Sequence, residues 1–497
     1  MKRLTAFLRS DWAFYVPLGL FVLSVAWVAI SSIYPMAFDE EFHYGLIKIY
    51  ATSWLPYGIQ HTSDMAQFGA ATADPSYLFH YLMSFPYRVL ASLGLSDTAI
   101  IVVLRLLNLG FIVSGLVVFR KAIRSAGVSK TVTNIGLWLL MLIPVFIMLA
   151  AQINYDNLLF LVVAWSILLI VDMTKQTRKT GVIPLLSTWL LAVAILIGIS
   201  IKYAFLPIAL ALFIWSVGLA IVSFRRQKKS LRIFGRTLTS QLASFSKWTL
   251  SGLICISILS IFFASHYIVN RTTYGHAIPS CEHVFTEDEC SAYGPWNRNR
   301  LYISERDQSF KPLSYPEYMA VEWFPGMTER LTFALAGKTN DFQTKPALPV
   351  VVFGYVLLTV IGLVCFVIQA AKRNITWFGW LTVLLTGVYA GVLSLQLYGD
   401  YVETARPVAI NGRYLLLLLP LAGIVLLQST VTVFKKVPTH IKVAIGMGIV
   451  AVLLIGGAGV STYIVQSEPH WFWPGFGQTS QTIFKNVLSA LVLPFRF

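Results

Sequence analysis

The sequence predicts an all-α polytopic membrane protein with about eleven transmembrane helices. Of its 497 residues, 57% are apolar and only 12% are charged, which is typical of an integral membrane protein and not of a soluble domain. Apolar runs recur along the whole chain, beginning with residues 13–33, which carry no charge. Such a run is long enough to cross a bilayer core of roughly 30 Å.

The charged residues predict the orientation in the membrane. The formal net charge is +16, but the basic residues gather in short loops between apolar runs. They are Lys2, Arg3, Arg9, Arg120, Lys121, Arg124, Lys130, Lys175, Arg178, Lys179, Lys372, Arg373, Lys435, Lys436, Lys442 and those in segment 225–247. Only Asp11 and Asp172 lie beside them, and every other acidic residue falls on the opposite side. Short basic loops stay in the cytoplasm, so we expect a cytoplasmic N-terminus, and contact with anionic lipids instead of nucleic acid.

Residues 1–466 contain eleven apolar runs, and we expect them to form one transmembrane domain. They are 13–33, 98–118, 135–153, 157–172, 182–201, 203–224, 248–268, 347–371, 375–398, 414–434 and 443–466. The first run lacks a small-residue cleavage site of the usual kind, so we interpret it as a retained signal anchor. An odd number of spans places the C-terminus outside.

Three segments on the predicted outer side have distinct compositions. Residues 34–97 are rich in aromatic residues, which favours helices lying in the membrane interface. Residues 269–345 mix Gly, Pro, Trp and charged residues, and we expect a small irregular cap. In the tail, residues 467–497, apolar residues recur at helical spacing, as in an interfacial helix. Cys281 and Cys290 both lie in the cap, where oxidising conditions would permit a disulfide. The sequence alone leaves open whether the two cysteines are bonded or free.

Several polar groups converge on the same outer face. Asp39, Glu40 and Glu41 follow the first run, and Asn154-Tyr155-Asp156-Asn157 fill the tight turn before the fourth. Lys202 precedes the sixth run, Asn411-Gly412-Arg413-Tyr414 open the tenth, and Arg105 lies about two turns inside the second. Carboxylates and cations at one membrane face suggest a site for an anionic amphiphile that also carries out proton chemistry.

Each of these groups also has a structural interpretation. Asp156 could cap the helix that follows it. Lys202 could extend to the interface, and Arg413 could anchor its helix there. Arg105 could pair with an acid purely for structure, and the carboxylates after the first run could belong to a solvated loop.

Taken together, these motifs resemble those of the C-type (GT-C) glycosyltransferases, polytopic enzymes that use polyprenyl-phosphate sugars. The closest resemblance is to a sub-group of bacterial membrane proteins, and it spans roughly residues 1–435. The motifs that carry it are Pro35, Asp39-Glu40, His43, Asp74-Pro75, Tyr81, Asn154-Tyr155-Asp156, Lys202 and Asn411-Gly412-Arg413-Tyr414-Leu415. The chain departs from the pattern in its third carboxylate, Glu41, and in Asp74-Pro75, where a pair of prolines is expected.

The resemblance implies a GT-C-like bundle that transfers a sugar from a polyprenyl-phosphate donor to an extracytoplasmic acceptor hydroxyl, with inversion. The products would serve cell-envelope glycan or glycoconjugate modification at the bacterial cytoplasmic membrane. The implied catalytic residues are Asp39 as general base, with Glu40 or Asp156 orienting the acceptor. The implied donor-phosphate ligands are Arg413, Lys202 and Arg105, and the acceptor or sugar contacts are His43, Tyr155 and Tyr414. Asp39 and Asp156 would bind a divalent cation only if the reaction is metal-dependent; no other cofactor is expected.

The main alternative is a transporter or flippase for an anionic lipid or glycolipid, which would use the same cations without needing paired carboxylates. A ligase that joins a lipid-linked glycan to an acceptor, or a scaffolding protein, is also compatible with the composition. The longest inner loop, about 225–247, lacks a Gly-rich phosphate loop, which disfavours a mechanism driven by a nucleotide.

Overall fold

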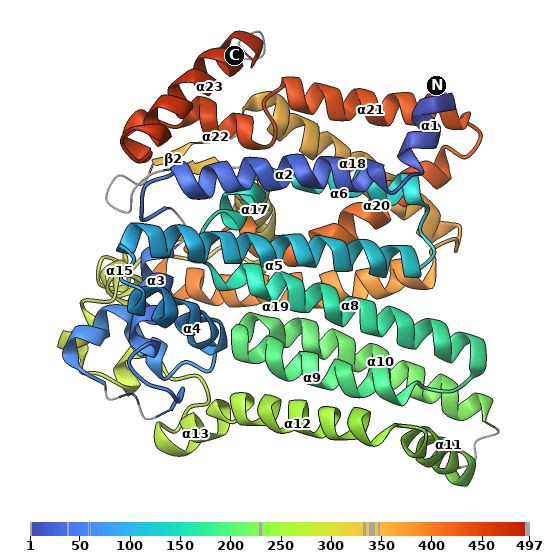
Figure 1. Cartoon of the computed structure of the whole chain (residues 1–497), viewed down its shortest axis with the longest axis horizontal. Coiled ribbons are helices and arrows are strands. Elements are labelled where there is room, and N and C mark those ends of the chain that lie inside the picture. Colours follow the sequence, from blue (N-terminus) through green and yellow to red (C-terminus); the bar gives the residue numbers. More distant parts are fainter. Residues whose placement is uncertain are drawn as a thin grey trace.

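The computed structural model is a bundle of long helices lying side by side, with shorter elements gathered at one end (Figure 1). It describes residues 2–36, 39–57, 59, 61–227, 231–331, 334–336, 343–345 and 348–492. The helices of the bundle are α2 (Trp12–Ser31), α5 (Asp97–Ser125), α6 (Lys130–Met141), α7 (Pro144–Ala150), α8 (Tyr155–Thr180), α9 (Leu185–Ile201), α10 (Leu206–Arg226), α12 (Lys247–Ala264), α18 (Pro349–Ala371), α19 (Trp377–Thr404), α20 (Leu419–Val433), α21 (Thr439–Ile455) and α22 (Val460–Gln466).

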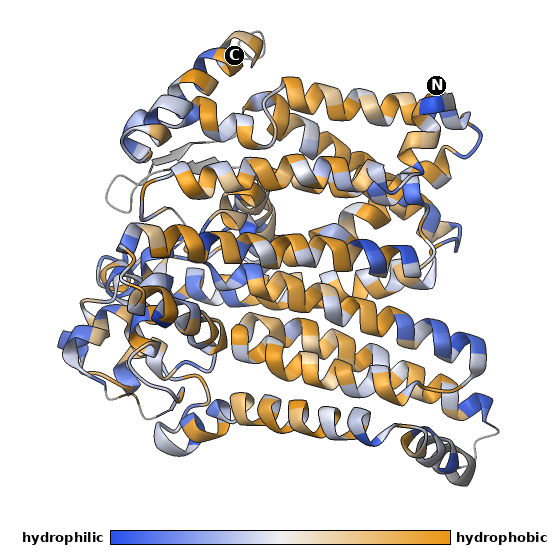
Figure 2. Ribbon diagram, in the orientation of Figure 1, coloured by the Kyte–Doolittle hydropathy of each residue, from blue (hydrophilic) through white to orange (hydrophobic). Residues whose placement is uncertain are grey.

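The predicted apolar runs all fall on helices or on pairs of consecutive helices. Eight helical segments of the described chain are long and apolar enough to cross a membrane, and the bent pair α6 and α7 would make a ninth. α9 and α20 are apolar but shorter. The prediction of a helical bundle with membrane-length apolar helices is confirmed, whereas the count of eleven is not. Figure 2 shows apolar residues along the bundle helices and polar residues gathered toward their ends.

The third predicted span is not one straight helix. α6 ends at Met141, α7 begins at Pro144, and the two axes differ by 75°. A proline has no backbone N–H to donate and its ring clashes with the preceding turn, so it ends a helix that would otherwise continue. This break directs the chain into the tight turn that leads to α8.

Polar residues cap the bundle helices where the sequence has Ser, Thr or Asn. The side chain of Ser96 accepts a hydrogen bond from the amide of Ala99 at the start of α5, and Asn154 accepts one from Asp156 at the start of α8. α5 and α8 then pack closely, because a Cβ atom at Gly115 would lie 2.5 Å from the ring of Phe160. These caps and contacts place the start of α8 against the core.

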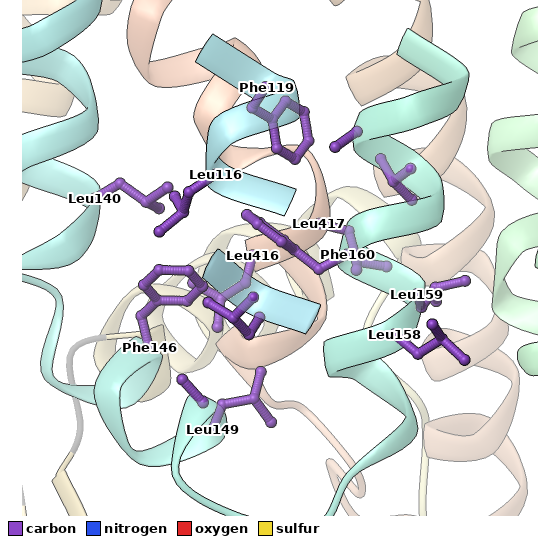
Figure 3. Packing of buried hydrophobic residues seen from close by; sticks show 14 of the residues in the cluster. Leu116, Phe119, Leu140, Phe146, Leu149, Leu158, Leu159, Phe160, Leu416 and Leu417 are labelled. Atoms are coloured by element: carbon purple, nitrogen blue, oxygen red, sulfur yellow. The ribbon is translucent and has the colours of Figure 1, made fainter. Parts of the chain in front are cut away.

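A continuous apolar core joins the helices below the polar end. Phe160 packs against Phe119 and Phe146, with ring centroids 5.0 and 5.5 Å apart. Leu416 and Leu417 enter the same core (Figure 3) from η6 (Gly412–Leu417). The segment that carries Arg413 is therefore anchored in the core.

The two ends of the bundle carry different elements. α1 (Lys2–Leu8) and α11 (Leu231–Ala243) lie at one end, and α3 (Glu40–Tyr50), α4 (Leu78–Ser92), α13 (His266–Thr273) and α15 (Gly294–Ser304) lie at the other (Figure 1). The remaining short elements are η1 (Ser63–Thr72), η2 (Tyr203–Phe205), η3 (Cys281–His283), α14 (Glu287–Cys290), α16 (Tyr315–Tyr318), the π-helix η4 (Met319–Trp323), α17 (Phe324–Leu331), the antiparallel strands β1 (Ala334–Ala336) and β2 (Gln343–Lys345), and η7 (Pro469–Trp471). The strand pair was not expected from the sequence.

The C-terminal segment forms α23 (Phe476–Val492), as its periodicity predicts. Backbone hydrogen bonds from Ile33 to Trp471 and from Trp473 to Ser31 fasten the segment before it to the end of α2. Ile483, Phe484, Val487 and Leu491 remain exposed along α23. An interfacial position for α23 stays a prediction that this amphipathic surface supports.

Candidate active site

Four charged residues from four parts of the chain meet as two ion pairs. Asp39 precedes α3, Asp156 lies in the first turn of α8, Lys202 ends α9, and Arg413 lies in η6. Arg413 Nη2 lies 2.9 Å from Asp39 Oδ2, and Lys202 Nζ lies 2.7 Å from Asp156 Oδ1. The structure thus brings together charges that the sequence separates by as many as 374 positions.

The pair Asp39–Arg413 is asymmetric in its exposure. The side chain of Asp39 is 62% exposed, whereas that of Arg413 is 8% exposed. Asp39 occupies the N-cap position of α3 in a left-handed conformation with φ 66°, and its side chain makes no capping hydrogen bond. Few residues other than glycine adopt this conformation. The carboxylate thus contacts Arg413 and does not cap the helix.

Arg413 is held in place by its own segment. The side chain of Asn411 accepts a hydrogen bond from the Arg413 amide at 3.1 Å. A Cβ atom at Gly412 would lie 2.4 Å from backbone atoms of both Met327 and Leu331 in α17, so only glycine permits this approach. The guanidinium carbon lies 5.3 Å from the ring centroid of Tyr414.

The ring of Tyr414 connects the two ion pairs, and the ring of Tyr155 covers Lys202. Lys202 Nζ lies 4.2 Å from the ring centroid of Tyr155 and 5.1 Å from that of Tyr414, whose ring also contacts Arg413. Asp156 and Lys202 are both buried. The second carboxylate oxygen of Asp156, Oδ2, is buried without a hydrogen-bond partner in the described part of the chain. Aromatic faces stabilise a cation at such distances, so the rings hold Lys202 beside Arg413.

Glu40 and Arg105 form a separate, fully buried ion pair. Arg105 Nε and Nη2 each lie 2.7 Å from a carboxylate oxygen of Glu40, in a bidentate arrangement. Arg105 also donates to the carbonyl oxygens of Ala29, Ser32 and Ile33, and Glu40 accepts from the amides of Met36 and Ile153. The geometry favours the structural interpretation of Arg105 over phosphate binding, and it gives Glu40 no free oxygen with which to orient an acceptor.

Asparagine side chains brace the turn that presents Asp156. Asn108 Oδ1 accepts from the amide of Asn154 and from the side chain of Asn157, each at 3.2 Å. Asn157 also donates to the carbonyl oxygens of Leu149 and Gln152. Sequence analysis missed Asn108, although a lone amide inside an apolar span is a signal of a buried partner.

His43 packs against Tyr155 and contacts His80. His43 Nδ1 lies 2.9 Å from His80 Nε2, both residues are buried, and the His43 ring centroid lies 4.5 Å from that of Tyr155. Burial lowers the pKa of His80 to about 3, and burial followed by the charge of His80 holds the pKa of His43 well below its usual value. His43 thus supports Tyr155 in this structure, and His80 was missed by sequence analysis.

Asp74 supplies a further carboxylate near the site. It is half-buried, accepts a hydrogen bond from the Ser76 amide at 2.7 Å, and forms no ion pair with the described residues. Burial raises its pKa, while the Ser76 amide partly opposes that shift. Ser76 in turn accepts from the amide of Tyr203, next to Lys202. Burial, and then the charges of Asp74 and Asp39, raise the pKa of Tyr293 in the cap to about 12.

The described residues do not form a metal site, because nowhere do three or more His, Cys, Asp or Glu side chains gather suitably around one point. Asp39 and Asp156 are each neutralised by a cationic side chain instead. In the cap, Cys281 and Cys290 are bonded as a disulfide and are packed with Ala66 and Phe285. The bond joins η3 to α14 within the cap, and this joined pair packs against Ala66 of η1.

Comparison with known proteins gave one similar structure and no family. No protein-family model and no curated protein matches the chain. Among solved structures, the crystal structure of ArnT from Cupriavidus metallidurans bound to undecaprenyl phosphate is similar, at 14% sequence identity and a TM-score of 0.47. The match covers 98% of this chain and 72% of that one. The roles of residues in this chain rest on its own geometry and motifs.

Proposed function

We propose that this chain is a membrane glycosyltransferase that moves a sugar from a polyprenyl-phosphate donor to an acceptor hydroxyl on the outer side of the membrane. The observation that carries the proposal is the pairing of an exposed carboxylate, Asp39, with a buried guanidinium, Arg413, at one end of a membrane-length bundle. A lipid phosphate lies at this level of a bilayer while its polyprenyl tail lies among the helices. The motifs shared with C-type glycosyltransferases support the same class.

The transfer step needs one base and several cations. The acceptor oxygen attacks the anomeric carbon, its proton passes to Asp39, and the bond from that carbon to the phosphate oxygen breaks. The bonding electrons leave with the lipid phosphate, whose charge Arg413 and Lys202 would stabilise. The guanidinium offers fork-shaped donors that match phosphate oxygens, and the ammonium supplies a compact charge. A direct displacement of this kind inverts the anomeric centre.

The neighbouring residues have supporting roles in this proposal. Asp156 orients Lys202, and the rings of Tyr155 and Tyr414 hold that ammonium and remain candidates for sugar or acceptor contact. Glu40 and Arg105 hold α3, α5 and the turn before α8 together. Asp39 and Asp156 would hold a divalent cation only if the reaction is metal-dependent, and the step described above does not require one.

The test is donor consumption by the purified chain in proteoliposomes. Liposomes made from bacterial membrane lipids that contain polyprenyl-phosphate sugars would be followed by mass spectrometry, with and without membrane acceptors. We expect one sugar-bearing donor to disappear while polyprenyl phosphate accumulates, and we expect Arg413→Lys to slow this more than Lys202→Arg. Movement of the donor between leaflets with its sugar bond intact would contradict the proposal and favour a flippase.

A further inference from the structure

The two groups of the proposed site that should act on different substrates are bound to each other in this structure. Asp39 is the proposed base for the acceptor, and Arg413 is the proposed ligand for the donor phosphate, yet Oδ2 of the first lies 2.9 Å from Nη2 of the second. A lone pair that accepts a hydrogen bond from the guanidinium is not available to take a proton. The Nη2 group that donates to Asp39 is likewise not available to a phosphate.

The structure indicates which partner can leave. Arg413 is fixed by the Asn411 cap, by the close approach of Gly412 to α17 and by Leu416 and Leu417 in the core. Asp39 has a 62% exposed side chain, and among the described residues its side chain bonds to Arg413 alone. Water can therefore solvate the carboxylate as soon as it separates from the guanidinium.

The second ion pair provides a contrast. Asp156 and Lys202 are both buried, and the rings of Tyr155 and Tyr414 lie over the ammonium. Separating this pair would leave a carboxylate without solvent, which costs several kcal/mol. Of the two ion pairs, Asp39–Arg413 is therefore the one whose carboxylate water can solvate after the pair separates.

We propose that the donor phosphate displaces Asp39 from Arg413, so that the Oδ2 atom of the base becomes available only after the donor has bound. This inference rests on the proposed function and adds an order of events to it. Phosphate and carboxylate oxygens compete for the same guanidinium N–H groups, and the phosphate oxygens match the fork as well as the carboxylate does. Once released, Asp39 stays beside the reacting centre because its backbone is fixed at the start of α3.

The test measures the binding of a lipid phosphate to single and double variants and requires no sugar transfer. Geranyl phosphate, a short polyprenyl monophosphate, would be titrated into the detergent-purified full chain, with geraniol as the control for tail binding. Asp39→Asn keeps the size of the side chain and removes the competing charge. Because water screens the exposed carboxylate of Asp39 and weakens its hold on Arg413, we expect the Kd for geranyl phosphate to fall by only about 2–5-fold.

Two further variants make the result specific. Glu41→Gln removes the same charge from an exposed residue in the same turn and should leave the Kd unchanged. In an Arg413→Gln background, where binding is already weak, adding Asp39→Asn should have no further effect, as a double-mutant cycle requires for a direct competitor. Asp39→Ala, compared by gel filtration and thermal unfolding, repeats the measurement if the Asn variant does not fold.

The outcomes separate this inference from the proposed function. Unchanged or weaker binding by folded Asp39 variants, or full binding by Arg413→Gln, would overturn it. The binding variants could behave as expected while no donor is consumed in the transfer assay. In that case the competition between phosphate and Asp39 for Arg413 stands, and the glycosyltransferase proposal fails.

Discussion

Glu40 and Arg105 show how burial determines the role of a charged residue. Both side chains are fully buried, and five hydrogen bonds from Arg105 satisfy Glu40 and three backbone carbonyl oxygens. Removing one charge of such a pair leaves the other uncompensated in a medium that solvates it poorly.

We therefore expect Glu40→Gln to destabilise the protein by about 3 kcal/mol, because the Arg105 guanidinium loses its counter-charge. Thermal and denaturant unfolding in detergent would measure the loss, with the exposed Glu41→Gln as the matched control. Equal stability of the two variants would mean that the pair does not hold this part of the fold together.

The buried histidines predict a dependence of stability on pH. The folded-state pKa of His80 is about 3, below the usual value of 6.5, so below pH 6.5 the unfolded chain binds a proton that the folded chain does not. As the pH falls from 6.5 toward 3, the free energy of unfolding should decrease by about 1.4 kcal/mol for each pH unit. Unfolding temperatures at pH 7.5 and 5.0 would measure this loss, and His80→Gln should reduce it. An identical loss in wild type and variant would rule out His80 as its source.

At the scale of single residues, the sequence predicted where the charges lie but not how they pair. Asp39, Asp156, Lys202 and Arg413 each adjoin a turn at the same predicted face, and this placement follows from alternating spans. Their partners lie far away in the chain, 46 positions for Lys202 and 374 for Arg413. Pairing over such separations depends on helix packing, which no local pattern specifies.

At the scale of elements, η6 and α17 meet through Gly412. A methyl group there would lie 2.4 Å from backbone atoms of α17, which cannot move as a flexible side chain would. We expect Gly412→Ala to destabilise the protein by about 1–3 kcal/mol and to weaken donor-phosphate binding, because η6 also carries Arg413.

The control for this variant is Gly423→Ala in α20, where a Cβ atom would meet nothing within 4 Å. Both variants would be compared by unfolding in detergent and by geranyl phosphate binding. Wild-type values for Gly412→Ala would show that the contact with α17 does not position Arg413.

The elements were largely predictable, because long apolar runs specify helices and Ser, Thr and Asn mark several of their starts. The break before α7 was missed since hydropathy does not register a bend, although Pro144 was a visible signal for it. The strands β1 and β2 pair segments of three residues each, too short for a periodic pattern to reveal.

At the scale of the whole molecule, the charge asymmetry predicts that the site faces away from the cytoplasm. Asp64 in η1 and Arg300 in α15 lie among the elements at the site end and should both be outside. Cysteines introduced at these positions, in a chain lacking the free Cys255 and Cys365, should react with an impermeant thiol reagent in intact cells. Protection of both, with labelling only after the membrane is opened, would reverse the orientation and contradict an outer active site.

The most direct test of the proposed chemistry is the turnover of Asp39→Asn. Asparagine keeps the shape of the side chain and removes its ability to accept the acceptor proton. The rate of polyprenyl phosphate release from the sugar-bearing donor should fall by about 10²–10⁴-fold, while the variant folds and binds geranyl phosphate at least as tightly as the wild type. Turnover close to that of the wild type in the folded variant would show that Asp39 is not the base and would contradict the mechanism proposed for this site.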